Sequence, residues 1–407
     1  GLALVAYGVL AYGYATSTPA WQNPDEPAHY NYVAFVAQTA GLPELRQGDW
    51  DSALLERLKT GTLRPGDSIA TIRYESWQPP LFYLVAAPVF RIGPVDDPLP
   101  VIQRLRALDI VLGGITLVLA YRIARHVFDP ELAVAVPLAM VGVPMFVAVA
   151  AALSADPLAN LLAAAILLAL LQPTGRLGWP VVVGALLGLG LLTKLELAIF
   201  IPIALAVLII RSQNRVRDTM ILLGTTAIVA APWLVHQVTT YGWTDPLALA
   251  RHSAIVADQP RFPGLTLDWL GQFLTVSFHS FWAQFGWMAI VAPDRLYLIW
   301  GILGVAVLIG LVMARRRLVE PEWLLMVATV LVAFVAYVGY NFAFEQFQSR
   351  YVFTALTPIA ALLVLGWATL LPRRTLPWSV LALTTALVAL NAYALLRVLV
   401  PGFAPTS

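Results

Sequence analysis

The sequence of 407 residues has no cysteine, only two lysines and few charged residues of either sign. Without cysteine, the chain cannot form disulfide bonds, use a thiol nucleophile or bind a metal through thiolates. The net charge is +2, and no basic stretch is interleaved with aromatic residues, which argues against nucleic-acid binding. The sequence also lacks a Gly-rich motif of the kind that surrounds nucleotide phosphates.

Apolar residues dominate what is present. Hydrophobic residues make up 59% of the chain and charged residues 12%, whereas soluble domains average about 45–50% and about 25%. The mean hydropathy is +0.77. Because a helix needs about 20 apolar residues to cross a bilayer, the sequence predicts an all-α polytopic membrane protein with about eleven spans, in one domain covering residues 1–407. The predicted spans are residues 1–15, 101–125, 131–152, 157–171, 179–193, 196–210, 219–237, 295–313, 322–341, 351–371 and 377–398.

The basic residues predict the orientation of these spans. All the basic clusters fall between spans on one side, namely Arg122 with Arg125, Arg176, residues 211–217, residues 315–317, and Arg373 with Arg374. Since such clusters mark cytoplasmic loops, we expect a cytoplasmic N-terminus. Two long loops then face the other side, residues 16–100 and residues 239–293.

Both long loops are rich in Trp and Tyr, which is typical of a layer at the membrane interface. In the first loop we expect a helix ending near residue 39, a short helix over residues 51–59 and an interfacial helix over residues 77–91. If residues 77–91 were instead a span, every later span would be reversed. In the second loop, residues 277–288 (SFHSFWAQFGWM) predict an amphipathic interfacial helix.

Residues 23–30 (NPDEPAHY) form an acidic motif directly after the first apolar segment. Asp25 or Glu26 can cap a helix whose first turn holds a proline, and their charges suit its positive end. Asp25 and His29 are four residues apart and therefore share a face. The motif is thus compatible with a helix cap beside a solvated loop, or with a functional cluster that also includes Tyr30.

Polar positions also fall at the predicted extracytoplasmic ends of separate spans, namely Asp25 with Glu26, Asp156, Lys194 and Arg350. An ionisable residue at membrane depth costs about 2.5–3.5 kcal/mol on insertion scales, so function is the default interpretation. Arg104 and Arg106 stand at the outer end of the second span, against the usual bias, and call for a phosphate or carboxylate partner.

Simpler explanations exist for three of these residues. Asp156 precedes a proline and can cap a helix. Lys194 can extend to the headgroups and pair with Glu196, although a compact ammonium there also suits a lipid phosphate. Arg350 can pair with Glu345 across a polar hairpin.

The order of the motifs carries more information than any one of them. The chain has, in succession, the acidic pair, residues 78–83 (QPPLFY), arginines opening the next span, residues 154–156 (SAD), residues 190–194 (GLLTK), and Arg350-Tyr351 followed by Pro358. This set covers essentially the whole chain and resembles the GT-C glycosyltransferases that use polyprenyl-phosphate sugars, such as aminoarabinose transferases and protein O-mannosyltransferases. It is most similar to a bacterial branch whose acceptor is unassigned.

The resemblance implies a role for each matching residue. Asp25 matches the catalytic base, and Glu26 an acidic neighbour that helps a metal or an acceptor. Asp156 matches a second acidic residue facing the cavity. Lys194 and Arg350 match ligands of the carrier phosphate. Arg104 and Arg106 are further candidate ligands of that phosphate. Gln78 stands where relatives often have His or Lys, which puts a charged role there in doubt, and His29, Tyr30 and Glu196 are additional candidate substrate contacts.

The predicted function is transfer of a hexose or pentose from a polyprenyl phosphate to the hydroxyl of a glycan, lipid or protein acceptor, at the extracytoplasmic face of a bacterial inner membrane. With Asp25 as single base, direct displacement inverts the anomeric centre. Glu26, His29 and Asp156 could hold a divalent cation, with Mg²⁺ or Mn²⁺ favoured over Zn²⁺. One alternative is a transporter or flippase of lipid-linked glycans, which uses the same basic residues to hold a phosphate. Another is a ligase with a polyprenyl-diphosphate donor, which favours more paired arginines and a histidine near the phosphates.

Overall fold

The computed structural model describes the chain except for residues 62–63, 65, 175–177, 373 and 405–407. Arg176 and Arg373, predicted to belong to basic clusters, lie outside the described residues. In chain order the elements are α1 (Leu2–Ser17), α2 (Glu26–Thr39), α3 (Ser52–Lys59), η1 (Ile69–Thr71), α4 (Leu81–Phe90), α5 (Pro98–Ala124), α6 (Pro130–Ala133), α7 (Ala135–Val141), α8 (Pro144–Ala150), α9 (Asp156–Leu171), α10 (Trp179–Leu191), η2 (Leu195–Ile199), α11 (Phe200–Arg211), α12 (Arg215–Tyr241), α13 (Leu249–Ile255), α14 (Leu267–Trp282), β1 (Gln284–Phe285), β2 (Ile290–Val291), α15 (Asp294–Met313), α16 (Pro321–Asn341), η3 (Ser349–Ala355), α17 (Leu356–Thr369), α18 (Leu376–Ala394), η4 (Leu395–Leu399) and α19 (Val400–Gly402).

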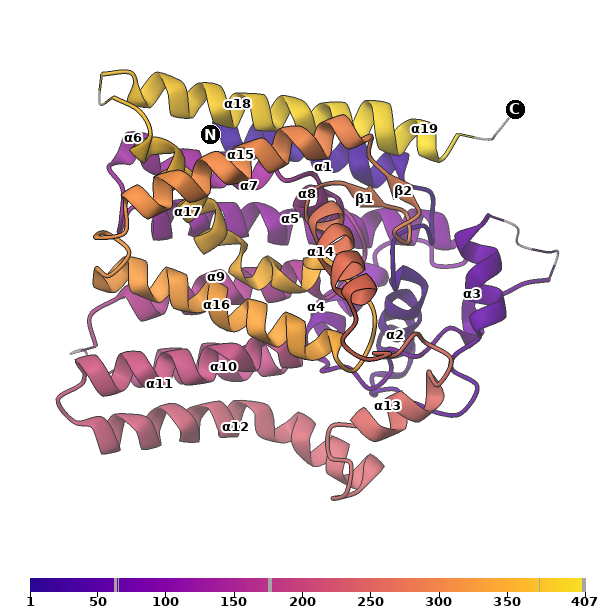
Figure 1. The fold of residues 1–407 in the computed structure, drawn as a ribbon. Coiled ribbons are helices and arrows are strands. Elements are labelled where there is room, and N and C mark those ends of the chain that lie inside the picture. The colour runs from indigo at the N-terminus through magenta and orange to yellow at the C-terminus, as the bar shows by residue number, and fades with distance from the viewer. Residues whose placement is uncertain (62–63, 65, 175–177, 373, 405–407) are drawn as a thin grey trace.

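The long helices lie roughly parallel to one another, with α18 and α15 at one edge of the bundle and α12 at the other (Figure 1). The elements of the two long loops, α2, α3, α13 and the β1–β2 hairpin, gather at one end of the bundle (Figure 1). The connections α11–α12 and α15–α16, which carry Arg211 to Arg217 and Arg315 to Arg317, lie at the opposite end. The fold thus separates the basic connections from the acidic motif.

The all-helical, multi-span character predicted from composition is confirmed, but eleven spans are not. Among the described residues, six helices are long and apolar enough to cross a membrane, or seven if a bent pair counts as one span. Four further apolar helices have only 10–17 residues, namely α1, α4, α9 and α10. The helix α4, within residues 77–91, has ten residues, fewer than the about 17 that a membrane-spanning helix needs.

Two predicted helices are interrupted for local reasons. The expected span at residues 131–152 breaks ahead of Pro144, and the segments Pro130–Val141 and Pro144–Ala150 meet at 72°. Proline offers no N–H to a helix and disfavours a helical residue before it. The expected helix at residues 277–288 is also wrong in extent, because α14 ends at Trp282 and a hairpin follows in which Gln284 pairs with Val291.

Close packing of the long helices relies on small residues. Where α15 meets α17, a Cβ added to Gly310 would lie 1.8 Å from the carbonyl oxygen of Gly366. The two backbones can therefore approach only because both positions are glycine, as is common where membrane helices pack. Buried side chains of α5, α9 and α17 belong to one large apolar core.

Candidate active site

Asp25 occupies the N-cap position of α2, yet its side chain does not cap the helix. Its backbone is left-handed (φ 64°), and its carboxylate accepts a hydrogen bond from the Tyr74 hydroxyl at 2.7 Å and pairs with Arg350. Burial opposes ionisation here, but the charge of Arg350 and the hydrogen bonds from Arg350 and Tyr74 act together against it, and the pKa of Asp25 is lowered to about 2. The simple helix-cap interpretation of Asp25 is therefore wrong.

Five predicted residues from separate parts of the chain meet in one cluster. Asp156, the first residue of α9, forms an ion pair with Lys194 and lies 3.5 Å from the guanidinium of Arg350. Arg350 thereby connects Asp25 with Asp156, while Glu196 lies 3.7 Å from the Lys194 ammonium. These side chains are 6–22% exposed, so the cluster of two cations and three carboxylates is largely shielded from water.

Aromatic side chains surround the cluster. The ring of Tyr351 lies 5.5 Å from the Lys194 ammonium and 5.3 Å from the Arg350 guanidinium, within the range of cation–π attraction. His29 bonds to the Tyr83 hydroxyl at 2.9 Å, and burial lowers the pKa of His29 to about 4. His29 is therefore neutral at physiological pH, so it adds no charge to the cluster. Tyr30 packs instead on Trp21 and Phe90.

Glu26 and Arg106 bind each other. Both side chains are fully buried, and the two nitrogens Nε and Nη2 of Arg106 donate to the two carboxylate oxygens at 2.8 and 2.7 Å. The remaining N–H groups of Arg106 bond to backbone carbonyls between Ala15 and Pro19. Since a guanidinium has five N–H donors, none is left for a phosphate. Arg104 donates to the carbonyls of Phe90 and Pro94.

Comparison with known proteins identifies the architecture. A family model described as "Dolichyl-phosphate-mannose-protein mannosyltransferase" matches residues 78–236. ArnT from Cupriavidus metallidurans, in its crystal structure bound to undecaprenyl phosphate, aligns with 98% of this chain and 73% of its own at a TM-score of 0.56 and 14% identity. The chain has the GT-C fold. The resemblance predicted from the order of motifs is thus confirmed. A search of curated proteins finds no significant match.

The GT-C fold also relates the chain to a larger enzyme. The oligosaccharyltransferase of Archaeoglobus fulgidus aligns with 98% of this chain at a TM-score of 0.51 and 13% identity, but the alignment covers 55% of that protein. This chain therefore spans about half of its length. A second crystal structure of that enzyme, with Zn and sulfate, aligns at a TM-score of 0.50 and 14% identity.

The predicted metal ligands do not assemble as a metal site in this GT-C fold. In the part of the chain that the structure describes, no group of three or more His, Asp or Glu residues is arranged to hold an ion. The carboxylate of Glu26 is bound by Arg106, and that of Asp156 faces Lys194 and Arg350. A divalent cation would have to displace these cations, so the residues as arranged do not fit a resident metal.

Sequence reasoning missed several residues of the site. Asp109 on α5 accepts a hydrogen bond from the Ser154 amide at 3.1 Å and so fixes the turn that precedes Asp156. Tyr74 and Glu75 approach Asp25 from the first loop, and Glu75 lies beside Gln78. The only available signal was their position, since Asp109 is an ionisable residue inside an apolar span and residues 74–75 precede the QPPLFY motif.

Glu75 makes stability depend on pH. Burial, reinforced by the charge of Asp25, raises the pKa of Glu75 to about 8 from 4.5. The folded protein then holds a proton that the unfolded chain releases, so this contribution to stability is complete below about pH 4.5 and is lost as the pH rises towards about 8. We expect the melting temperature to fall between about pH 5 and about pH 8, and Glu75→Gln to reduce that fall. The exposed Glu56→Gln serves as the control; an equal fall in all three proteins contradicts the prediction.

Proposed function

We propose that the protein is a glycosyltransferase that moves a sugar from a polyprenyl-phosphate carrier to the hydroxyl of a glycan, lipid or protein acceptor. The observation that carries the proposal is the pair of buried cations, Lys194 and Arg350, held against the carboxylates of Asp25 and Asp156. Buried cations at the outer end of a bundle suit a lipid phosphate, and the similar ArnT binds undecaprenyl phosphate.

In this proposal the donor phosphate competes with the carboxylates for the two cations. The leaving group gains negative charge as the bond between the anomeric carbon and the phosphate oxygen breaks. Lys194 and Arg350 stabilise that charge because they are already fixed in a site with little water. Asp25 and Asp156 balance the charges of the two cations and hold them in place until the donor arrives.

Binding of the phosphate also prepares the base. When the phosphate takes the N–H groups of Arg350, Asp25 loses the cation that holds its pKa at about 2. The pKa of Asp25 then rises, because burial and the neighbouring phosphate charge both oppose its ionisation, and Asp25 becomes a stronger base. Asp25 accepts the proton of the acceptor hydroxyl, whose oxygen attacks the anomeric carbon opposite the leaving phosphate, so the anomeric configuration is inverted.

The remaining predicted residues act around this centre. Glu26 and Arg106 join α2 to α5 and thereby fix the acidic motif, so we assign them a positioning role. Glu196 shares the Lys194 ammonium with Asp156. We place the site at the extracytoplasmic face of a bacterial inner membrane, with the N-terminus in the cytoplasm, because the basic connections lie at the opposite end of the bundle.

Lys194→Ala tests the phosphate site. Loss of one charged hydrogen bond is expected to weaken binding of undecaprenyl phosphate by about 10- to 100-fold. Lys59→Ala removes the only other lysine, which pairs with Glu56 at 2.7 Å outside the cluster, and is expected to bind normally. The measurement is binding to purified protein in detergent, alongside release of radiolabelled sugar from polyprenyl-phosphate sugars with several acceptors and metals.

Two results would redirect the proposal. Equal binding by wild type and Lys194→Ala would remove Lys194 from the phosphate site. Normal donor binding by wild type with no sugar transfer under any condition, together with movement of the lipid-linked sugar across vesicle membranes, would identify a flippase instead of a transferase.

A further inference from the structure

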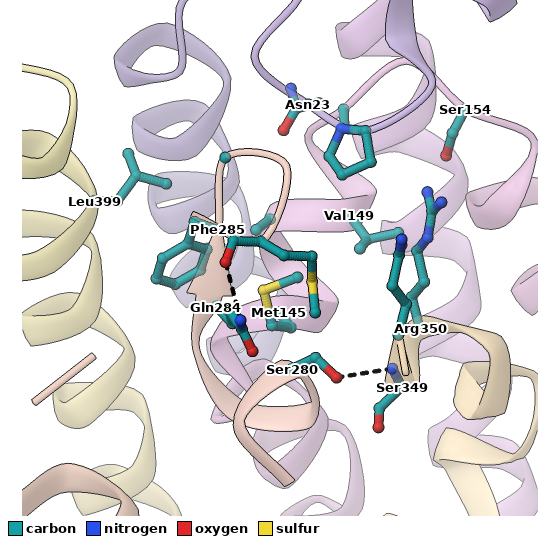
Figure 2. Close-up of a pocket in the computed structure, with 16 residues that line it drawn as sticks. Asn23, Met145, Val149, Ser154, Ser280, Gln284, Phe285, Ser349, Arg350 and Leu399 are labelled. Carbon is teal, nitrogen blue, oxygen red and sulfur yellow. Dashed lines mark hydrogen bonds between the residues drawn. The ribbon is translucent and has the colours of Figure 1, made fainter. Parts of the chain in front are cut away.

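A pocket beside the ion-pair cluster contains two polar atoms without partners. It is enclosed by the acidic motif, α8, α14, the β1–β2 hairpin, the start of η3 and η4 (Figure 2). Within the described part of the chain, neither Oε1 of Gln284 nor Nε of Arg350 has a hydrogen-bond partner, although both atoms are buried. Gln284 is 8% exposed and the Arg350 side chain 9%. Because unpaired buried polar groups are costly, these atoms point to a ligand.

The chemistry of the two atoms limits what the ligand can be. Oε1 of Gln284 can only accept a hydrogen bond, and Nε of Arg350 can only donate one. An ionised phosphate would satisfy Arg350 but could not donate to Gln284, and a lipid chain would satisfy neither. A hydroxyl group both donates and accepts. Ligands with several hydroxyls on a compact apolar frame are sugars.

The rest of the pocket suits a sugar ring. Polar side chains on its wall include Asn23, Ser154 and Ser280, while Met145, Val149 and Phe285 supply apolar surface for the C–H groups of the ring (Figure 2). Arg350 is the one ionisable residue among the described residues that line it. With no carboxylate on the wall, the pocket favours a neutral sugar over one with a cationic amine.

The backbone around the pocket is unusually strained. Seven described residues other than glycine have positive φ. One of them, Met288, lines this pocket, and three more, Asp25, Trp287 and Phe347, are each next in the chain to a residue that lines it. Such conformations cost of order 1–3 kcal/mol each and gather at functional sites. The hairpin is also fastened to the acidic motif, because the Trp287 indole donates to the Trp21 carbonyl at 2.9 Å.

We infer that this pocket binds the ring of a neutral, hydroxyl-bearing sugar, with Gln284 as the residue that selects it. The inference rests on the proposed function and names the class of sugar that the site takes. Since Arg350 belongs to both the pocket and the phosphate site, a sugar attached to the bound phosphate lies within reach of Gln284. The donor sugar is the first candidate, and a sugar of the acceptor is the other source of the same chemistry.

The test compares binding of undecaprenyl phosphate, undecaprenyl-phosphate glucose and undecaprenyl-phosphate aminoarabinose to purified wild type, Gln284→Leu and Gln284→Glu. Gln284→Leu removes the acceptor atom, so the glucose donor should bind about 5- to 100-fold more weakly while undecaprenyl phosphate binds unchanged. Gln284→Glu keeps an acceptor oxygen but loses the hydrogen bond from Nε2 to the Met288 carbonyl. It should restore binding of the glucose donor and improve binding of the aminoarabinose donor.

The outcomes separate this inference from the proposed function. If Gln284→Leu leaves donor binding intact but raises KM for the acceptor, the pocket holds the acceptor's sugar. If donor binding and acceptor KM both stay at wild-type values, the sugar pocket is refuted while the transferase proposal stands. If both Gln284 variants lose undecaprenyl phosphate binding as well, Gln284 is structural and the inference fails. If wild type itself binds none of the three lipids, the proposed function fails first.

Discussion

Asp25→Asn is expected to lower the rate of sugar transfer by about 10²- to 10⁴-fold, the range that a positioned general base contributes. The asparagine oxygen can still accept the Tyr74 hydrogen bond, now 2.7 Å long, so the loop keeps its conformation. The amide cannot take up the acceptor's proton. Binding of undecaprenyl phosphate should be retained or strengthened, because the variant removes a negative charge that competes with the phosphate for Arg350.

The decisive measurement is kcat with saturating donor, alongside the affinity for undecaprenyl phosphate. Asp51→Asn is a matched control in the same loop, because Asp51 caps α3 through the Leu54 amide and asparagine caps helices equally well. Full transfer by Asp25→Asn would sink the assignment of the base. A parallel loss of lipid binding would instead show that Asp25 mainly holds Arg350 in place.

The pH dependence of Asp25 follows from the same ion pair. Because its pKa is lowered to about 2, the pairing with Arg350 contributes stability above the ordinary pKa of about 3.9 and is lost as the pH falls towards about 2. The carboxylate is therefore ionised throughout the physiological range. If activity were lost on acidification near neutral pH, protonation of a group other than Asp25 would have to be the cause.

Much of the site was predictable because its residues carry charge in a sequence that is otherwise mostly apolar. In an apolar chain, Asp25, Asp156, Lys194 and Arg350 stand out as charges at the ends of spans, and all four meet in the structure. Helix ends with clear local signals were predictable too, such as the end of α2 at Thr39 and the extent of α3. Charge at membrane depth is costly enough to mark a site without any knowledge of the fold.

What could not be predicted depends on contacts between distant segments. Nothing in the sequence says that Arg106 turns to Glu26, 80 residues away, when a phosphate would satisfy it equally well. In the sequence, nothing distinguishes Gln284 from other polar residues. Only the fold, in which left-handed residues after Gln284 form a hairpin, leaves its side-chain oxygen unpaired in a pocket. The count of eleven spans is not confirmed, because apolar segments such as α1, α9 and α10 form helices of only 16, 16 and 13 residues.

The second large expected effect is a loss of folding stability when the ion pair of Glu26 with Arg106 is broken. Arg106→Met leaves the fully buried Glu26 carboxylate without its cation, and breaking a buried ion pair in this way costs about 3–5 kcal/mol. Arg104→Met is the matched control on the same helix, since the hydrogen bonds of Arg104 to the described residues go to the backbone carbonyls of Phe90 and Pro94, and its loss should cost about 1 kcal/mol. Unfolding of the purified variants in detergent gives the difference.

The double variant Glu26→Gln with Arg106→Met distinguishes two roles of Arg106, as the ion-pair partner of Glu26 or as a ligand of the donor phosphate. The introduced glutamine side chain is neutral, so the double variant should be more stable than Arg106→Met alone, because no unpaired charge remains buried. The Trp21 and Leu153 amides now donate to different oxygens of Glu26, Oε2 at 2.8 Å and Oε1 at 3.3 Å, so the single glutamine oxygen keeps one of these two hydrogen bonds. If Arg106→Met instead unfolds like wild type but binds undecaprenyl phosphate more weakly, Arg106 is the phosphate ligand that its place in the sequence predicts. Arg106 would then have to leave Glu26 when the donor binds, and the acidic motif would move with it.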